Sequence, residues 1–546
     1  MVIFQSPYAA APFPNEPFHE TVLSAIKRHA LSGKNKTAFI NGDNSGPNIS
    51  YQQLYDSTHS VATFLHQKGF GKDVACLVLP NCWQYAALFL GVARVGGAIS
   101  GASALFTDYE LQRQFTDSKA KVVVTTEDFM PKTIIAAKNS PTVKFVIVIK
   151  KNADTVLPAG VFDFDEIVKT PANPQLPKPK LDIKKDLLLL PYSSGTTGAP
   201  KGVMLSHYNF GMMINIYAKH DHDNNAKVLD KNWDYENETI MLFLPFYHVF
   251  GFGLLVTSLL FGSAGVILSH FEPNNFCSAV QKNKIRMLPL VPPILVFLAK
   301  HPICDKYDLS SVQYILCGAA PAGRDICEEI FKRYPNIKHI QQGYGMTELT
   351  MATHFPDLAN GQPLGSVGRL ASNLEMKIVD ISDNKEVKLG DKGEICIRGP
   401  TIMMGYLGRE EATKGCIING WMHTGDIGYV DKAGNLFIVD RLKELIKVKG
   451  LQVAPAELED LLLSHPRIRD AAVIGVPDKR AGELPKAYVV RADEKLTEQE
   501  IKDFVKSKVS AYKQLAGGVE FLQEIPKSAA GKILRRMLRD KATSKL

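Results

Sequence analysis

The chain has 546 residues, of which 45% are hydrophobic and 22% charged. At roughly 150 residues per domain this length makes three or four domain-sized units with a large buried core, and the composition excludes disorder as the main state. The eight cysteines contain no C-x-x-C pair and mostly lie in apolar stretches. This usage indicates a reducing compartment and excludes a disulfide scaffold or a zinc ribbon.

Alternating helical and strand patterns begin near Tyr51. We expect helices over 54–65 and 83–95, and buried strands over 74–79 and 121–125. Repeated βα units predict a mainly parallel sheet with helices on both faces. Prolines between 171 and 179 predict a linker-like loop ahead of a strand over 186–190. The expected fold class is α/β, with a large N-terminal domain of several subdomains built on doubly wound sheets.

One apolar stretch raises the question of a membrane segment. No Asp, Glu, Lys or Arg occurs between Glu238 and Glu272, which is long enough to span a bilayer. Pro245 and four glycines interrupt the stretch, which favours buried strands and helices of a large core. The N-terminus lacks a basic region followed by an apolar one, so no secretory signal is expected.

The positive charge is concentrated near the C-terminus. The net charge is +8, and residues 441–546 carry 22 Lys and Arg against 15 Asp and Glu, a net of +7. We expect a domain of residues 1–440 followed by a small, mobile α+β domain of residues 441–546, with strands over 468–476 and 487–490 and helices over 456–463 and 498–509. A basic domain beside a nearly neutral one suits a lid over a polyanionic small molecule better than a nucleic-acid surface, so no nucleic-acid partner is expected.

A segment rich in Ser, Thr and Gly follows the strand predicted over 186–190. Glycines let the backbone approach a phosphate chain, hydroxyls donate to its oxygens, and a lysine adds charge. The spacing is not that of a Walker A loop. The candidate phosphate-binding residues are Ser193, Ser194, Gly195, Thr196, Thr197, Gly198 and Lys201.

This segment, S-S-G-T-T-G-x-P-K-G, resembles the phosphate loop of the adenylate-forming superfamily, which includes acyl-CoA synthetases, 4-coumarate:CoA ligases and beetle luciferases. Six further motifs resemble that superfamily in order. They lie at 244–248 (LPFYH), 318–321 (GAAP), 342–348 (QGYGMTE), 421–426 (WMHTGD), 440–447 (DRLKELIK) and 526–532 (PKSAAGK). The similarity is greatest to the peroxisomal 4-coumarate:CoA ligase-like and luciferase-like acyl-CoA synthetases.

The resemblance implies a reaction in which a carboxylate attacks the α-phosphate of ATP, pyrophosphate leaves, and CoA captures the acyl-adenylate. Charge that builds on the phosphoryl oxygens is stabilised by a nearby cation, and Lys532 matches that cation. Glu348 matches a Mg²⁺ ligand, since a hard cation prefers carboxylate and phosphate oxygens. The remaining implied nucleotide contacts are Gln342, Gly343, Tyr344, Thr347, Asp426, Arg441 and Lys443. The residues expected to act in catalysis are His248, Thr347, Glu348, Lys447 and Lys532.

Thiol capture needs Lys532 to leave, so the resemblance implies rotation of the C-terminal domain about 440–443. Lys447, Lys449, Gly450 and Gln452 would then line the CoA path. ATP, Mg²⁺ and CoA are the expected cofactor and co-substrates.

The acid is less determined than the reaction. The expected pocket walls are His248, Phe250, Gly251, Leu254, Gly318, Ala319, Met346 and Thr350. Coumarate-type ligases often have a tyrosine where Phe250 stands, and luciferases commonly have an arginine where Met213 stands. These two differences favour a medium- or long-chain fatty acid or another hydrophobic acid. The alternatives are a hydroxycinnamate ligase, a luciferase-type mono-oxygenase and a catalytically silent binding protein.

Two polar features receive other interpretations. His220-Asp221-His222-Asp223 is expected to be solvated surface. Ser544-Lys545-Leu546 matches the peroxisomal address and implies the import receptor as a partner.

Overall fold

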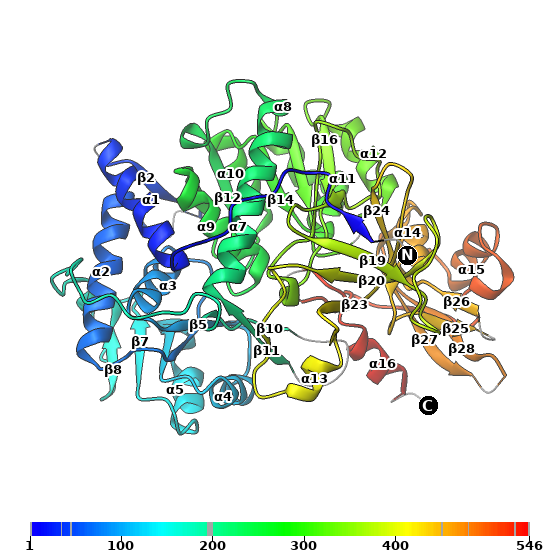
Figure 1. Cartoon of the computed structure of the whole chain (residues 1–546). Coiled ribbons are helices and arrows are strands. Elements are labelled where there is room, and N and C mark those ends of the chain that lie inside the picture. The colour runs from blue at the N-terminus through cyan, green and yellow to red at the C-terminus, as the bar shows by residue number, and fades with distance from the viewer. Residues whose placement is uncertain are drawn as a thin grey trace.

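The computed structural model describes residues 3–33, 35–43, 46–193, 200–320, 322–448, 451–478, 480–528 and 531–543, without the side chains of Gln452 and Thr543. A large N-terminal part is followed by a smaller C-terminal part, coloured orange to red in Figure 1. The mixed α/β class expected from the sequence is confirmed.

The first large sheet has nine strands, and six of them run parallel in the order β9-β5-β4-β6-β7-β8. Strand β4 (Val74–Val78) is a continuous apolar run and β6 (Val122–Thr126) is apolar over its first three residues, as expected for strands of a sheet that helices cover. The expected helices correspond to α2 (Tyr51–Gln67) and α3 (Gln84–Arg94). The other strands of this sheet are β5 (Ala98–Ala102), β7 (Phe145–Ile149), β8 (Val161–Asp163), β9 (Leu187–Leu189), β10 (Tyr192–Ser193), β11 (Lys201–Ser206) and β21 (Gly405–Tyr406).

Two smaller sheets complete the parallel architecture. The strands β12, β13 and β2 are parallel, with β3 added antiparallel, and β14, β15 and β16 are parallel. Their bounds are Thr37–Asn41 (β2), Ile49–Ser50 (β3), Thr239–Leu242 (β12), Ala264–Ile267 (β13), Met287–Leu290 (β14), Tyr314–Cys317 (β15) and His339–Gln342 (β16). The neighbouring helices include α1 (Phe18–Ser32), α7 (His207–Asp221), α9 (Val249–Phe261), α10 (Pro273–Asn283), α11 (Pro292–Lys300) and α12 (Arg324–Arg333).

The uncharged stretch between Glu238 and Glu272 forms β12, α9 and β13, which confirms that it is core. None of the described helices is long and apolar enough to cross a membrane. The proline-rich loop over 171–179 is anchored, since the buried Arg94 guanidinium donates to the carbonyl oxygens of Pro174, Leu176 and Pro177.

An antiparallel sheet connects the two parts of the chain. Its order is β1-β19-β20-β23-β22, with β24 paired to β23. The bounds are Phe4–Gln5 (β1), Glu375–Val379 (β19), Gly393–Arg398 (β20), Ile417–Ile418 (β22), Trp421–Val430 (β23) and Leu436–Arg441 (β24). Strand β24 runs one residue past the expected boundary after residue 440, and that boundary stays a prediction.

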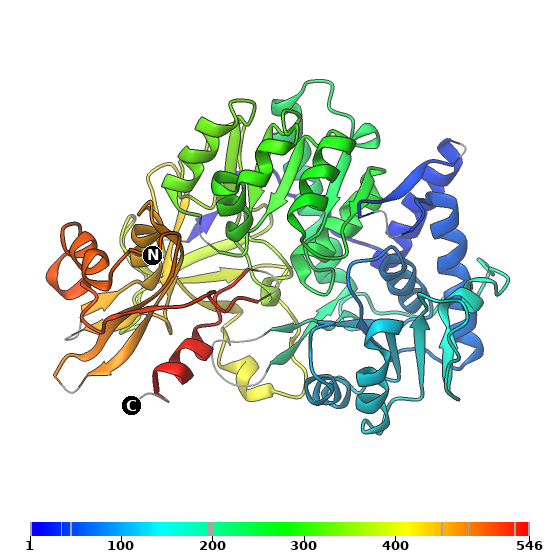
Figure 2. The ribbon, with the colours of Figure 1, turned by 180° about the vertical axis from the view of Figure 1, so that it is seen from behind.

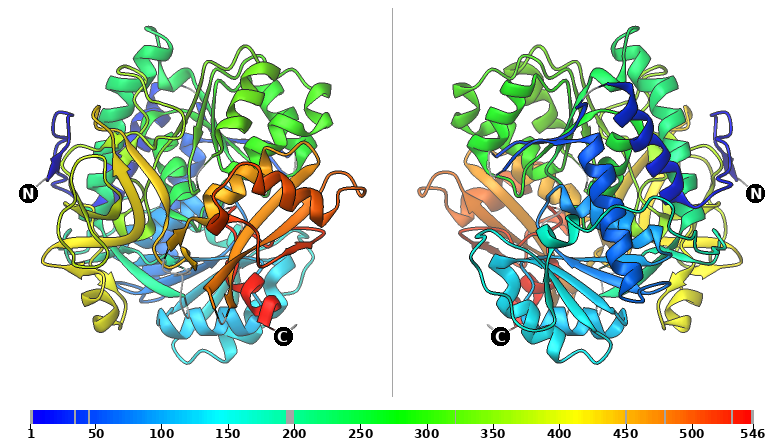
Figure 3. Two further views of the ribbon diagram at one scale, coloured as in Figure 1. Left: turned by 90° about the vertical axis from the view of Figure 1, so that its right-hand side faces the viewer. Right: turned by 90° about the vertical axis from the view of Figure 1, so that its left-hand side faces the viewer.

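The C-terminal part contains a five-stranded sheet with a core of its own. Alternate residues of β27 (Ile468–Asp478) and β28 (Gly482–Arg491) face two separate apolar clusters. Helices α14 (Pro455–Leu463) and α15 (Glu498–Lys506) cover one face (Figure 3), and α16 (Arg535–Thr543) packs on the other. The remaining strands are β25 (Ile446–Val448), β26 (Leu451–Val453) and β29 (Val519–Phe521). Seen from behind, the red segment before α16 extends from this sheet towards the middle of the molecule (Figure 2).

Candidate active site

One cavity of about 940 Å³ lies between the N-terminal sheets and the segment that precedes α16. Its charged end is lined by Tyr344, Glu348, Asp426, Arg441 and Lys532. Its deep end is lined by the buried residues Tyr217, His220, Asp221, Asn225 and Tyr314. Apolar side chains lie between the two ends.

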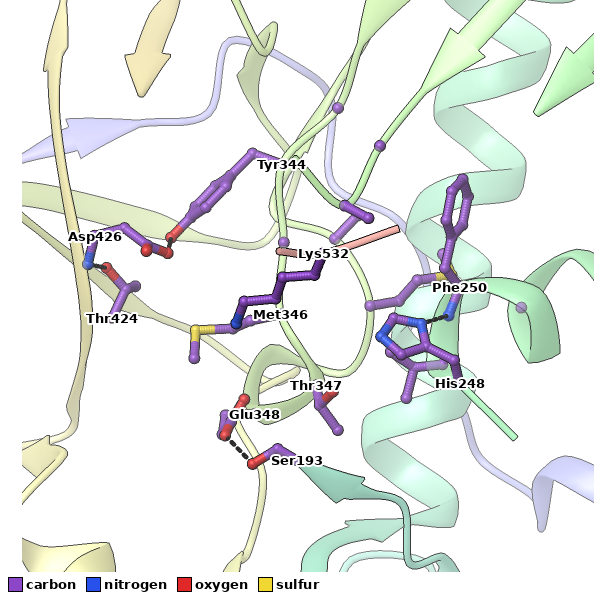
Figure 4. Close-up of a pocket in the computed structure, with 18 of the residues that line it drawn as sticks. Ser193, His248, Phe250, Tyr344, Met346, Thr347, Glu348, Thr424, Asp426 and Lys532 are labelled. Atoms are coloured by element: carbon purple, nitrogen blue, oxygen red, sulfur yellow. Dashed lines mark hydrogen bonds between the residues drawn. The ribbon is translucent and has the colours of Figure 1, made fainter. Parts of the chain in front are cut away.

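At the charged end, the buried carboxylate of Asp426 is held by two neighbours. The Tyr344 hydroxyl donates to Asp426 Oδ2 at 2.7 Å, and Arg441 Nε lies 3.3 Å from Oδ1. Burial raises the pKa of Asp426, while Arg441 and Tyr344 act in the opposite direction. The backbone N–H of Asp426 donates to Thr424 Oγ1, which fixes the turn that presents the carboxylate (Figure 4).

Lys532 extends into the cavity between Asp426 and His248 (Figure 4). Its backbone N–H donates to Ser528 Oγ at 3.2 Å, and its carbonyl accepts from Ser528 N at 2.8 Å, which closes a tight turn. Gly531 in this turn has φ +77°, and a Cβ there would lie 3.1 Å from Pro293, so glycine suits both the backbone and the packing. Burial, with a further contribution from Arg441, lowers the pKa of Lys532 to about 8.

The Glu348 carboxylate is oriented by two hydroxyls. Ser193 Oγ donates to Oε1 at 2.8 Å, and the Tyr406 hydroxyl donates to the same oxygen at 2.9 Å. Among the described residues, Oε2 has no hydrogen-bond partner. Lys201, which also lines the cavity, places its ammonium 4.9 Å from the centre of the Tyr406 ring. Within the described residues, the arrangement leaves one carboxylate oxygen of Glu348 for a cation, and the Lys201 ammonium lies over the ring of the tyrosine that holds the other oxygen.

His248 stands at the start of α9, where Nδ1 accepts a hydrogen bond from Phe250 N at 3.3 Å. Because Nδ1 accepts, the neutral ring carries its proton on Nε2. Burial, with a smaller contribution from Lys532, lowers the pKa of His248 to about 4. The Phe250 ring packs against Gly318, where a Cβ would lie 3.1 Å from it.

Most of the expected site residues for which positions are described line this cavity. They are Ser193, Lys201, His248, Phe250, Leu254, Gly318, Ala319, Gly343, Tyr344, Met346, Thr347, Glu348, Asp426, Arg441, Lys443 and Lys532. Ser194 to Gly198, Lys449, Gly450, the side chain of Gln452 and Ser544 to Leu546 lie outside the described residues.

Four expected residues do not line the cavity. Gly251 is buried in the helix, where a Cβ would come within 2.3 Å of Pro245 O. Thr350 is fully buried and donates to Thr401 O. The Gln342 side chain bonds the backbone of Ala322. Lys447 is exposed on β25. In this arrangement the first three positions pack against or hydrogen-bond to the backbone, and their expected roles in the pocket wall and at the nucleotide stay predictions.

The expectation that His220 to Asp223 is solvated surface is half wrong. His222 and Asp223 are exposed, but His220 and Asp221 are buried and line the deep end. The helical repeat gives the missed signal, because Asp221 stands one turn after Tyr217, on the buried face of α7. Met213, on which the argument against a luciferase rested, is fully buried and is not among the cavity-lining residues.

The fold and the cavity are those of a class of enzyme that binds a nucleotide and an acid in one cavity, which is covered by a separate C-terminal part. The family model described as "AMP-binding enzyme" matches residues 26–407, and the model for its C-terminal domain matches residues 457–532. The chain therefore belongs to the AMP-binding enzyme family. The resemblance to adenylate-forming enzymes is confirmed, and so is the expectation of an AMP-forming acid:CoA ligase that uses ATP and CoA.

Named relatives extend over nearly the whole chain. It is 40% identical over 498 residues to 4-coumarate–CoA ligase 1 of Solanum tuberosum, covering 90% of this chain and 88% of that one. It is 39% identical over 556 residues to 4-coumarate–CoA ligase 2 of Nicotiana tabacum, covering 100% and 98%. The fold is similar to that of an anthranilate CoA ligase in complex with anthranoyl-AMP, with a TM-score of 0.84, 23% identity and 99% coverage of both chains.

Proposed function

We propose that this acid:CoA ligase activates a carboxylic acid with an apolar body, and that the reaction takes place in the cavity that joins Lys532 to the deep end. The continuity of that cavity carries the proposal, because it connects charged groups suited to a nucleotide with the apolar walls of Phe250, Leu254 and Met351. An acid lying along these walls would present its carboxylate towards Lys532.

At the charged end, Asp426 is suited to accept hydrogen bonds from two vicinal ribose hydroxyls. Tyr344 and Arg441 hold that carboxylate in place before the nucleotide arrives. Lys532 would contribute most where negative charge develops on the phosphoryl oxygens, since a preorganised cation in a buried site stabilises the transition state more than the ground state. His248 is neutral at pH 7 and supplies an N–H donor beside the acid.

Glu348 is the residue suited to hold Mg²⁺. Its Oε1 is fixed by two hydroxyls, and its Oε2 has no partner among the described residues, so an oriented carboxylate oxygen remains for a hard cation that also binds phosphate. When bound, the ion would neutralise phosphate charge.

The second half-reaction requires a different position of the C-terminal part. Lys532 lines the cavity into which a thiol would have to reach to meet the acyl carbonyl, while Lys447 is exposed. We propose that rotation about residues 440–443 withdraws Lys532 and brings Lys447 and residues 449–452 towards the CoA path.

A medium- or long-chain fatty acid is the substrate that Phe250 and the apolar walls favour. The relatives named 4-coumarate–CoA ligase support a hydroxycinnamate as the second candidate. CoA-dependent release of AMP across fatty acids and hydroxycinnamates tests the proposal, and turnover of either class supports the ligase. No turnover with any acid, no exchange of pyrophosphate into ATP, or light emission with luciferin and ATP would contradict it.

Delivery to peroxisomes through Ser544-Lys545-Leu546 remains a prediction. A fluorescent fusion with and without these three residues checks it, and equal distributions of the two proteins would contradict it.

A further inference from the structure

The deep end of the cavity contains polar groups that an acid with a purely apolar tail would leave without partners. Tyr217 and Asp221 come from α7, Tyr314 begins β15, and Asn225 follows α7. We propose that this end binds a hydroxyl group carried by the substrate far from its carboxylate, with Tyr217 and Tyr314 as specificity-determining residues. This inference rests on the proposed ligase function and adds the substrate class.

Strand β15 places the deep end far from the reacting groups. Tyr314, Leu316 and Gly318 alternate along the strand and its extension, so they share the face that lines the cavity. Gly318 contacts the Phe250 ring near His248. At about 3.3 Å per residue, Tyr314 lies about 13 Å along the strand from Gly318. A substrate that reaches both ends therefore has a body of about this length, and Leu316 between them makes its middle apolar.

The two tyrosine hydroxyls are available for a ligand. Among the described residues, neither the Tyr217 nor the Tyr314 hydroxyl has a hydrogen-bond partner, although both side chains are buried. By contrast, the buried Tyr51 hydroxyl, away from this cavity, has the carbonyl oxygens of Ser258 and Ser263 as partners at 3.2 and 3.1 Å. Buried hydroxyls are normally paired, so the two in the cavity wall indicate a group that the ligand supplies.

Asp221 lies beside the two tyrosines, and hydrogen bonds hold its carboxylate in place. The Tyr235 hydroxyl donates to its Oδ2 at 2.5 Å, and the Asn225 amide lies 3.3 Å from Oδ1. Asn225 is fixed in turn, because its Oδ1 accepts from Leu358 N at 3.3 Å. These contacts come from residues outside the cavity as well as in it, so the deep end is ordered without a ligand.

The chemistry of this wall favours a hydroxyl over other groups. Phenolic hydroxyls both donate and accept, which matches a group that does the same. A second carboxylate would face Asp221, and the lysines and arginines that line the cavity, within the described residues, are Lys201, Arg441, Lys443, Lys527 and Lys532. Lys201 contacts the Tyr406 ring, and Arg441 and Lys527 pair with Asp426 and Asp470. Within the described residues, none of the five cations forms an ion pair with a residue of the deep end.

His220 closes the wall without competing for the hydroxyl. Its Nε2 lies 2.7 Å from Pro356 O, so this nitrogen carries the proton and Nδ1 is an acceptor. Nδ1 is buried with no partner among the described residues. Burial lowers the pKa of His220, so the ring adds no charge to the deep end at neutral pH.

Two matched pairs of acids test this inference on the full chain. The first is cinnamate with its para-hydroxy derivative, and the second is dodecanoate with its ω-hydroxy derivative. We expect kcat/KM for CoA-dependent AMP release to be at least about tenfold higher for the hydroxylated member of one pair, because a site built around a hydroxyl rejects the analogue that lacks it. The pair that shows the preference identifies an aromatic or an aliphatic body.

Tyr217→Phe and Tyr314→Phe each remove one hydroxyl with little change of shape. Each should reduce the hydroxyl preference about three- to tenfold, through a lower kcat/KM for the hydroxylated acid alone. Tyr55→Phe is the matched control, because Tyr55 is a half-buried tyrosine of α2 outside the cavity that has no hydrogen bond among the described residues. It should keep the wild-type ratio.

Equal kcat/KM within both pairs for the wild-type enzyme would overturn the inference, and so would an unchanged preference in both phenylalanine variants. If a variant fails to fold, the wild-type ratio decides alone. Exchange of pyrophosphate into ATP, measured with all four acids, separates failure of this inference from failure of the proposed ligase function. Exchange without a hydroxyl preference leaves the ligase in place and rejects this inference, whereas no exchange with any of the four acids rejects both.

Discussion

The charge on Lys532 should control the first half-reaction, and its burial makes that control visible in a pH profile. With a pKa of about 8, the ammonium is roughly nine-tenths protonated at pH 7 and roughly one-tenth at pH 9. The pKa is lowered from its usual value, so the active charged form is present below pH 8 and is lost as the pH rises through it. The profile of kcat/KM for ATP reports groups of the free enzyme, and we expect its alkaline limb near pH 8.

The wild-type enzyme and two variants of Lys532, each measured in two assays, test this prediction. Exchange of pyrophosphate into ATP measures adenylation, and CoA capture of a supplied acyl-adenylate measures the second step. Lys532→Ala should lower adenylation about 10² to 10³-fold, remove the limb near pH 8 and spare capture. Lys532→Arg stays charged over the whole profile, because a guanidinium loses its proton only above about pH 12. This variant should therefore lose the limb while retaining more activity than the alanine variant. Equal loss of both steps in Lys532→Ala, or an unchanged limb, would refute the assignment of this residue.

The other predictions concern the nucleotide contact, a buried ion network and a packing glycine. Asp426→Asn should lower kcat/KM for ATP about 10- to 100-fold, because hydrogen bonds to a charged acceptor are lost. Asp383→Asn, in an exposed turn, is the control. Equal kinetics of the two variants would contradict a contact between Asp426 and the nucleotide. Arg535→Leu should lower the free energy of unfolding by about 3–5 kcal/mol, since Glu444 and Glu459 are left buried without their cation. Denaturant titration measures this loss, with Arg536→Leu, at an exposed arginine, as the control. A loss below about 1 kcal/mol would contradict the network. Gly251→Ala should destabilise the protein by about 1–3 kcal/mol, because the added carbon would lie 2.3 Å from a backbone oxygen. Gly33→Ala, with open space around it, is the matched control. A normal melting temperature together with an altered acid preference would instead support Gly251 as part of the pocket wall.

The sequence predicts the main elements where periodicity is strong. The helix expected over 54–65 lies within α2, and the strands expected over 74–79 and 468–476 are β4 and β27 within a few residues. These segments bury apolar residues at the period of their own secondary structure, so local pattern and tertiary packing agree. Pairing between distant strands, such as β1 with β19, carries no comparable local signal.

The motifs predict which segments lie near the cavity better than they predict which side chains line it. A motif contains both residues that line the cavity and residues that hold them in place, and spacing does not separate the two. Gln342 and Tyr344 stand two residues apart in one motif, yet the Gln342 amide bonds Ala322 while the Tyr344 hydroxyl lies in the cavity against Asp426. Thr350, close behind them, is left-handed with φ +66° and anchors a turn through Thr401. Such roles follow from hydrogen bonding in three dimensions.

The net charge of the C-terminal part says less about phosphate recognition than the positions of a few lysine and arginine side chains do. Of the lysines and arginines after residue 440 that the structure describes, Arg441, Lys443, Lys527 and Lys532 line the cavity. Lys527 is already paired with Asp470 at 2.6 Å, and Arg535 is enclosed by Glu444 and Glu459. Salt screens net charge beyond about 8–10 Å, so the excess of +7 can assist encounter with an anion but cannot select a phosphate. We expect selection to depend on Lys532, a half-buried cation whose turn holds it beside Asp426 and His248. Raising the ionic strength should therefore slow nucleotide association more than it slows adenylation of bound ATP.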